Sequence, residues 1–180
     1  MHRHDGRPSD RDRDSSPPAD RRLTPADALP RATVDSATDE AEADTARRRL
    51  RKQGIIAIEP DCQVAGLLDD DELLVAIRHA VDLNRRQPGP LERRGLPGDL
   101  YITTRRLLHL GGETICYDLE RIREAVIAGD ELMLMLDDGQ GVAISTSHPR
   151  LLRVEIAAAR AAARAEHRTT AVTGGREPEP

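Results

Sequence analysis

Residues Gly98–His148, GDLYITTRRLLHLGGETICYDLERIREAVIAGDELMLMLDDGQGVAISTSH, decide the fold. Within this stretch, short apolar runs alternate with polar residues, most clearly in LMLML at 132–136. Alternation with a period of two is typical of half-buried β-strands. Pairs such as Gly111-Gly112 and Gly129-Asp130 separate the runs and favour tight turns. The stretch therefore predicts an antiparallel series of strands, which needs two packed layers or a closed barrel.

The pattern changes at Pro149, because proline favours the first position of a helix. Ser147 or His148 is expected to cap this helix. Leu152 and Ile156 recur on one face with a helical period, and arginines lie largely elsewhere. We therefore expect an amphipathic helix that closes an open end or edge of the strands.

Upstream of the deciding stretch, residues 73–83 also alternate, with Val75, Ile77, Val81 and Leu83 on one predicted face. This pattern favours a first strand, although its Leu, Ala and Arg content leaves a helix as the alternative. The segment that follows, NRRQPGPLERRGLPG, contains three prolines and three glycines and predicts a loop at 84–98.

The composition divides the chain into four parts. Residues 1–39 have few large apolar side chains and are expected to form a disordered tail. Residues 40–66 are expected to form a charged helix, with acidic residues first and basic residues last, and then a linker. A nucleic-acid or membrane contact is the alternative reading of its basic run. Residues 67–166 form the strand-rich domain, and 167–180 a second disordered tail.

Composition and charge exclude several classes of protein. The chain has 180 residues, a net charge of −5, and two tyrosines as its only aromatic residues. An acidic balance without stacking aromatics argues against a nucleic-acid binder. No apolar run is long enough to serve as a secretory signal or a membrane span, so we expect a soluble, cytoplasmic protein. Cys62 and Cys116 form no CxxC pair and are expected to be reduced and buried or half-buried.

Four motifs together resemble the bacterial PH-like and GRAM-like domains, over about residues 68–165. The motifs are G-x-L-x-I-T-x-R-R-L-L-x-L from Gly98, L-x-R-I-R-E from Leu119, L-x-L-x-L-D-D-G from Leu132, and S-H-P-R-x-L from Ser147. The resemblance implies a mainly β fold: a PH-like, bent antiparallel sandwich or barrel of about seven strands, capped by a C-terminal helix. It also implies a module that binds lipids, peptides or other copies of itself.

The loop at 84–98 contains the candidate binding residues Arg85, Arg86, Arg93 and Arg94. In PH domains that this chain resembles, the corresponding loop faces an anionic ligand. Each basic residue near an anionic membrane contributes about 1 kcal/mol, so this loop alone gives little anchoring. A solvated loop, a site for an anion or lipid, and a docking site for a protein remain the three readings of these arginines.

No catalytic or metal-binding signature is present. His79, His109 and His148 are scattered over separate predicted strands or their ends, without HxH or HExxH spacing. The hydroxyl-rich run at 145–148 is adjacent in sequence, which does not make a triad, because a nucleophile and its base must converge in space. The acidic run at 69–72 lacks EF-hand spacing and is expected to be a solvated lead-in. We therefore expect no enzyme, no metal and no cofactor.

Two functions follow from these observations. The first is a non-catalytic PH-like interaction module that binds a protein partner, or associates with itself, through an exposed strand edge. The second is a peripheral membrane domain that binds anionic lipid through the arginine-rich loop.

Overall fold

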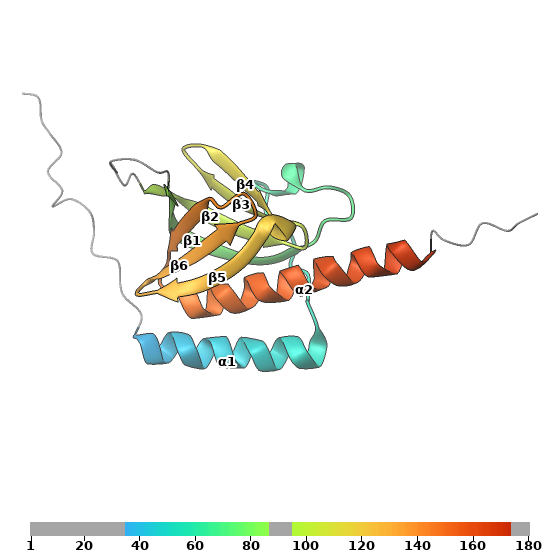
Figure 1. The fold of residues 1–180 in the computed structure, drawn as a ribbon, viewed down its shortest axis with the longest axis horizontal. Helices are drawn as coiled ribbons and strands as arrows, with labels where there is room; N and C mark the ends of the chain where they lie inside the picture. Colours follow the sequence, from blue (N-terminus) through green and yellow to red (C-terminus); the bar gives the residue numbers. More distant parts are fainter. Residues whose placement is uncertain (1–34, 87–94, 174–180) are drawn as a thin grey trace, which may run out of the picture. The chain divides into compact units, whose positions relative to one another are not determined.

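The structure is a computed structural model that describes residues 35–86 and 95–173, with side chains described over 35–84 and 95–165. Within these residues the chain forms seven strands and two α-helices (Figure 1). The helices are α1 (Ser36–Gln53) and α2 (Pro149–Thr173). The strands are β1 (Leu74–Arg86), β2 (Leu96–Thr103), β3 (Arg106–Gly111), β4 (Thr114–Asp118), β5 (Ile122–Ala128), β6 (Glu131–Leu136) and β7 (Gly141–Ser145). Short 3₁₀ helices lie at Ala65–Leu67 and Leu119–Arg121.

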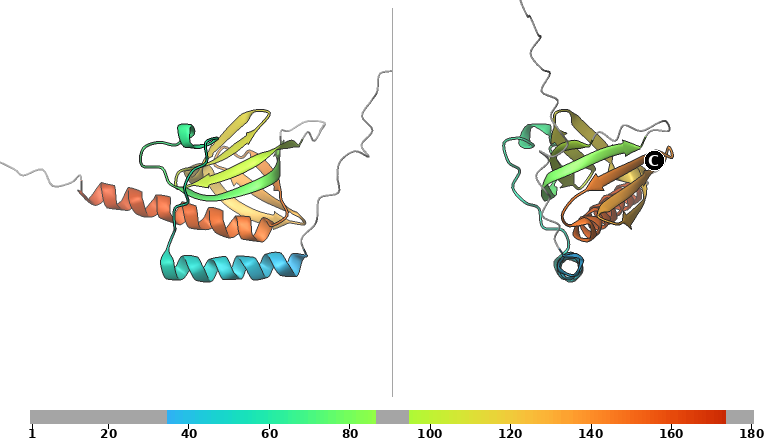
Figure 2. Two further views of the ribbon diagram at one scale, coloured as in Figure 1. Left: turned by 180° about the vertical axis from the view of Figure 1, so that it is seen from behind. Right: turned by 90° about the vertical axis from the view of Figure 1, so that its left-hand side faces the viewer.

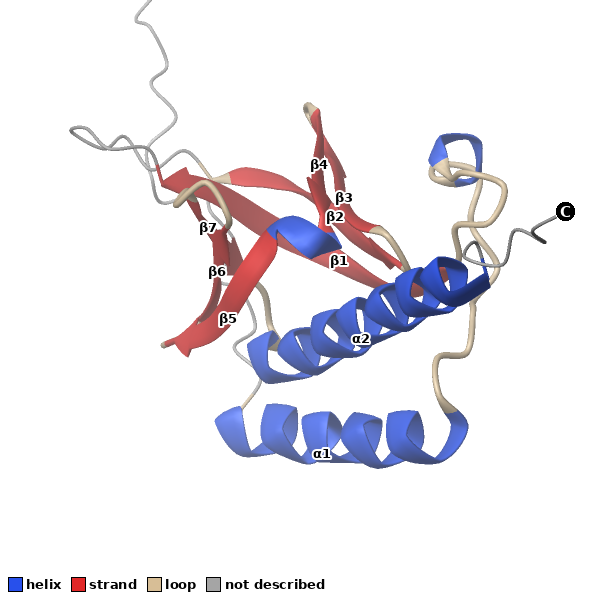
Figure 3. Ribbon diagram, turned by 45° about the vertical axis from the view of Figure 1, so that its right-hand side comes forward, coloured by secondary structure: helices blue, strands red, loops and turns tan. Residues whose placement is uncertain are grey.

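All seven strands belong to one sheet, in the order β4-β3-β2-β1-β7-β6-β5, and every neighbouring pair is antiparallel. β1 joins the two halves of the sheet, because its first part pairs with β2 and its last part pairs with β7. Figure 3 shows the two halves turned toward each other around β1, with α2 below them. The predicted fold class, a mainly β antiparallel sheet followed by a C-terminal helix, is therefore confirmed.

A bulge in β1 makes this bend possible. The register with β2 shifts between Arg78 and Val81, and Ala80 takes a φ of 55°. A bulge inserts a residue on one strand and changes which face the following side chains point to. Ala76, Val81 and Leu83 consequently share the main core, whereas Ile77 packs on the opposite face of the sheet. The prediction that Ile77 lies on the same face as Val81 and Leu83 is therefore wrong.

The main core lies between the two halves of the sheet and α2. Alternate residues of β6 are buried there, at Leu132, Leu134 and Leu136, as the period of two predicts. Leu152 and Ile156 of α2 pack into the same core, so the predicted buried face of this helix is confirmed. The core is built from aliphatic side chains, with Tyr117 packed against its margin.

A second apolar cluster lies on the other face of β2 and β3. It consists of Val64, Leu74, Tyr101 and Leu108, all of which are buried. Residues 55–73, which run between α1 and β1, cover this face; we call them the strap. The strap adds one isolated bridge to the sheet, between Ile58 and Leu74. The segment expected to be an irregular linker therefore packs on the sheet as a layer of its own.

α2 lies between α1 and the sheet in every view (Figures 1 and 2). The contact between the helices is small, with Ala43 and Ala46 of α1 against Val154 of α2 and two half-buried leucines beside them. Asp39 is 1% exposed, and its carboxylate accepts hydrogen bonds from the backbone N–H groups of Arg150 (2.9 Å) and Leu151 (3.0 Å).

Asp39 thus caps α2 from a different helix. The first N–H groups of a helix have no partner within it, and a carboxylate there satisfies them and opposes the helix dipole. The expectation that Ser147 or His148 supplies this cap is wrong, although the predicted start of the helix at Pro149 is confirmed. Tertiary packing brings the carboxylate of Asp39 within hydrogen-bond distance of these N–H groups.

Both helices extend beyond their expected bounds. α1 begins at Ser36, where the Asp35 side chain accepts a hydrogen bond from the N–H of Ala37, so residues 36–39 are helical. α2 continues to Thr173, past the end expected near His167. The greater part of the expected N-terminal tail, and the last residues of the C-terminal one, lie outside the described residues.

Candidate interaction surfaces

The prediction of a loop at 84–98 is wrong at both ends, because β1 continues to Arg86 and β2 begins at Leu96, and residues 87–94 lie outside the described residues. Arg85 and Arg86 are the last two residues of β1, where the backbone pairs with β7. Arg93 and Arg94 lie outside the described residues. In the sequence, all four arginines lie between Leu83 and Leu96, the last residues at which β1 and β2 are paired. Binding of an anion or a partner by these four side chains stays a prediction.

The strap is held by polar contacts as well as by its apolar cluster. The Tyr101 hydroxyl lies 2.9 Å from Oδ2 of Asp61 and 3.1 Å from Oε1 of Gln63. Burial, followed by the hydrogen bond to Asp61, raises the pKa of Tyr101 to about 12. Tyr101 therefore acts as a neutral donor that ties the strap to β2.

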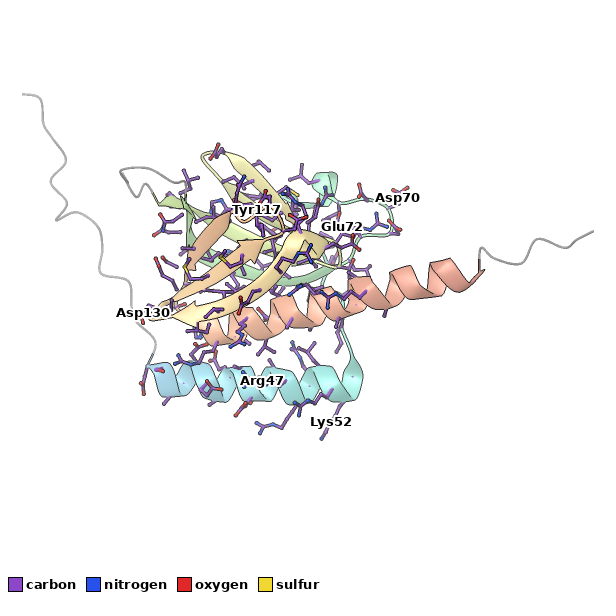
Figure 4. The ribbon with its side chains drawn as sticks, in the orientation of Figure 1. Arg47, Lys52, Asp70, Glu72, Tyr117 and Asp130 are labelled. Atoms are coloured by element: carbon purple, nitrogen blue, oxygen red, sulfur yellow. The ribbon has the colours of Figure 1, made fainter. Side chains whose placement is uncertain are left out.

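The acidic run at 69–72 is the second attachment of the strap, and Figure 4 marks Asp70 and Glu72 within it. The carboxylate of Glu72 accepts hydrogen bonds from Thr103 Oγ1 (2.6 Å) and from Arg106 Nε (3.0 Å). Asp71 forms an ion pair with Arg105. The expectation of a solvated run is wrong for Glu72, because the turn between β2 and β3 presents the hydroxyl and guanidinium that bury its carboxylate.

The three histidines of the described domain do not converge. His79 Nδ1 lies 3.1 Å from Asp99 Oδ2, and His148 Nδ1 lies 2.9 Å from Glu42 Oε2, without the alignment of a hydrogen bond. His109 is buried beside the main core, and neither of its ring nitrogens has a partner. In the part of the chain that the structure describes, no three His, Cys, Asp or Glu side chains are placed to hold a metal ion.

Cys62 and Cys116 are both free, as expected, but both are exposed rather than buried. Cys116 points to the strap side of β4, because Ile115 and Tyr117 occupy the core side. Ser145, in the hydroxyl-rich run before α2, donates its hydrogen bond to Glu131 (2.9 Å) instead of to a histidine. These residues therefore bring together no nucleophile and base.

β5 is an edge strand of the sheet and pairs with β6 alone among the described strands. Its first half is protected by a bulge between Ile122 and Glu124 and by the charge of Arg123. Charges and bulges are the usual devices that stop an edge from pairing with another chain. Its second half, Ala125–Ala128, contains neither a charge nor a proline. This half of the edge is therefore open to pairing.

Apolar side chains lie beside this open edge. Val126 is 42% exposed and pairs across the strands with Met133, while Met135 is 39% exposed on the same strand. Unbranched methionine side chains adapt to irregular partners. Val126, Met133 and Met135 together form what we call the β5 patch, a surface suited to protein contact.

A groove of about 590 Å³ runs between α1, α2 and β1. Small residues of α1, including Ala37, Ala41 and Thr45, line one wall. The opposite wall contains Glu155 of α2 and Arg78 of β1, which form a two-point ion pair. Burial raises the pKa of Glu155 more than the charge of Arg78 lowers it.

Comparison with known proteins finds a similarity among solved structures. No protein-family model matches the sequence, and no curated protein matches it. Among solved structures, the N-terminal PH domain of Vps36 is similar to this chain, with 16% identity and a TM-score of 0.42. The match covers 56% of this chain and 86% of that domain. Within the described residues, no helix has the length and apolar character needed to cross a membrane.

Sequence reasoning missed three of the features described above. The cap that Asp39 provides has no local signal, because Asp39 and Arg150 lie 111 positions apart. The run AVIA at 125–128 shows a lack of charge in the sequence, but the sequence does not show that this part of the strand lies at an edge of the sheet. The groove depends on how α1 docks, which no periodicity in α1 predicts.

Proposed function

We propose that this chain is a non-catalytic binding module that takes an extended segment of a protein partner at β5. One observation carries the proposal: the open half of β5, Ala125–Ala128, lies beside the exposed apolar side chains of the β5 patch. An added strand gains main-chain hydrogen bonds from an edge, and its alternate side chains gain specificity from the neighbouring face.

The β4 edge is the weaker candidate. β4 (Thr114–Asp118) ends in a charged residue, Asp118. Charges on an edge oppose pairing with another chain. The bulky exposed apolar side chains on the described strands, Val126 and Met135, lie on β5 and β6 and not beside β4.

The first experiment selects displayed, unstructured peptides against the whole chain. We expect bound peptides to slow amide hydrogen exchange at Ala125–Ala128 and to lose binding with Val126→Lys. Ile56→Lys is the matched control, because Ile56 is an exposed apolar residue (56%) that lies on the strap and not on β5. Peptides that bind without protecting β5, or that bind the Val126→Lys variant equally well, would rule out this surface.

A second candidate function is contact with an anionic surface through Arg85, Arg86, Arg93 and Arg94. It is favoured by the grouping of all four arginines within the sequence between Leu83 and Leu96, the last residues of the β1–β2 pairing. Sedimentation with anionic and neutral vesicles at low salt tests it. We expect any pelleting with anionic vesicles to disappear when the four arginines become alanine, and the absence of pelleting in the wild-type chain would end this proposal.

A further inference from the structure

The charges of α1 are segregated along its length. The acidic residues come first, at Asp39, Glu40, Glu42 and Asp44, and the basic residues follow, at Arg47, Arg48, Arg49, Arg51 and Lys52. Figure 4 marks Arg47 and Lys52 along this helix. Arg47 is neutralised within the helix by ion pairs with Glu40 and Asp44. Arg49, by contrast, makes no hydrogen bond or close ion pair with another described residue, although its charge lowers the pKa of Glu155 in the same groove.

One face of α1 borders the groove over three turns, through Thr38, Glu42, Thr45 and Arg49. These positions recur every three or four residues, so they form one stripe along the helix. At a rise of 1.5 Å per residue, the stripe is about 16 Å long. The small side chains of Ala41 and Thr45 leave the backbone of α1 accessible to another helix.

Two positions of this stripe carry opposite charges. In the first half of α1, Glu42 contributes an exposed carboxylate that lies 2.9 Å from the ring of His148. Near the end, Arg49 contributes an exposed guanidinium. The other two charges of the groove, the half-buried Arg78 and the buried Glu155, pair with each other. The exposed charges that remain in the groove are thus one anion and one cation, seven positions apart.

We propose that two copies of this chain associate through α1, with the helices antiparallel. A two-fold axis between Thr45 and Ala46 places Glu42 of each copy opposite Arg49 of the other. In a two-fold interface, residue i of one copy contacts residue j of the other, and j contacts i in return. A stripe that carries one anion and one cation is therefore complementary to a second copy of itself. The small residues between the two charges allow the close approach that the pairing requires.

The association is weak. α1 has 18 residues, which corresponds to a length of about 27 Å, and one helix pair of that length buries less than the roughly 1,200–2,000 Å² of a stable interface. Exposed ion pairs contribute little and are screened by salt. We therefore expect a dimer that forms at high protein concentration and dissociates as salt is added.

This surface is separate from the β5 patch, so the dimer and the binding of a partner at β5 are tested independently. Sedimentation velocity of the full chain over a hundredfold range of concentration at low salt measures the dimer. We expect Arg49→Glu and Glu42→Arg each to raise the dissociation constant about tenfold or more, because like charges then face each other. The double variant restores the pairing with its charges exchanged, so we expect it to dimerise as the wild type does.

Arg51→Glu is the matched control, because it makes the same charge change on α1 outside the groove. We expect it to leave the dissociation constant unchanged. Since Glu42→Arg also removes the contact with His148, Glu42→Gln provides a milder second variant, and circular dichroism checks the fold of each. A monomer at every concentration, a dimer that survives Arg49→Glu, or a double variant that fails to dimerise would overturn the proposal. Loss of the dimer with Val126→Lys instead would assign it to β5.

Discussion

At the scale of single residues, Glu72 is a buried carboxylate that joins the strap to the turn between β2 and β3. Burial raises its pKa, but hydrogen bonds from Arg106 and Thr103 outweigh that effect, so the pKa lies below its usual value of 4.5. Removing one member of a buried ion pair costs about 3–5 kcal/mol, because the other charge stays buried without a partner. Arg106 is partly exposed, so the lower end of that range applies.

We expect Glu72→Gln to lower the free energy of unfolding by about 3 kcal/mol at neutral pH. Because the folded-state pKa is depressed, the stability that Glu72 contributes is present above pH 4.5 and is lost as the pH falls through the folded-state value. The variant should therefore lose less stability on acidification than the wild type. Urea denaturation over a pH series measures both effects. Asp70→Asn is the control, and an equal loss there would contradict a specific role for Glu72.

The conformation of Ala80 makes a second prediction at this scale. Its φ of 55° lies in the left-handed region, which costs a residue with a Cβ roughly 1–2 kcal/mol. We expect Ala80→Gly to raise the thermal midpoint, with a gain of about 1 kcal/mol once the greater freedom of glycine in the unfolded chain is subtracted. Ala128→Gly, at an exposed position of β5, should lower it. A loss of stability in both variants would show that the bulge is not strained.

At the scale of elements, α1 is attached by the buried carboxylate of Asp39, by an ion pair between Glu40 and Arg150 of α2 (3.0 Å), and by a small apolar contact. Asp39 satisfies two N–H groups at the start of α2, and alanines supply most of the packing surface. Alanine buries little area, so the polar attachment contributes a large share of the docking free energy. α1 is therefore held by polar contacts to the start of α2 more than by a broad apolar interface.

We expect Asp39→Ala to destabilise the docking of α1 by about 1–2 kcal/mol, the usual cost of losing a helix cap. Amide hydrogen exchange should increase at Arg150 and Leu151 and along α1, while β6 and β7 remain protected. Asp44→Ala removes an exposed carboxylate of the same helix and should leave these rates unchanged. Unaltered exchange at Arg150 and Leu151 in the Asp39→Ala variant would contradict the cap.

At the scale of the whole molecule, the described chain consists of a sheet with a different cover on each face. α2 fills the main core on one face, and the strap covers the second apolar cluster on the other. α1 contacts α2 and adds little to either core. The strap is consequently part of the folded domain, and α1 is an accessory to it.

Two truncations distinguish these contributions. Removal of residues 1–54 deletes α1, and we expect the sheet to stay folded with a loss of about 2–3 kcal/mol, from the cap and the apolar contact together. Removal of 1–68 also uncovers Tyr101 and Leu108, so we expect binding of a hydrophobic dye and a much larger loss. Thermal unfolding and dye fluorescence measure both outcomes. A chain that unfolds on the first truncation would assign α1 to the core.

The sequence by itself determined the elements of the domain. Periods of two predict β2 to β7, Gly111-Gly112 and Gly129-Asp130 predict two of their turns, and Pro149 with Leu152 and Ile156 predicts α2 and its buried face. These signals are local, because each depends on residues within one strand or one turn of helix. The sequence also names the candidate binding arginines between β1 and β2, but it does not show what they contact.

Tertiary structure alone decided how the layers are joined. Asp39 reaches α2, and Glu72 reaches Arg106, across more than thirty positions of sequence, and no local pattern marks such pairs. The bulge at Ala80 shifted the faces of β1 because the sheet must bend there to close over α2. The open half of β5 and the stripe on α1 are exposed because no other described element packs against them. Which face of an element stays exposed depends on where all the other elements pack, and no local pattern encodes that.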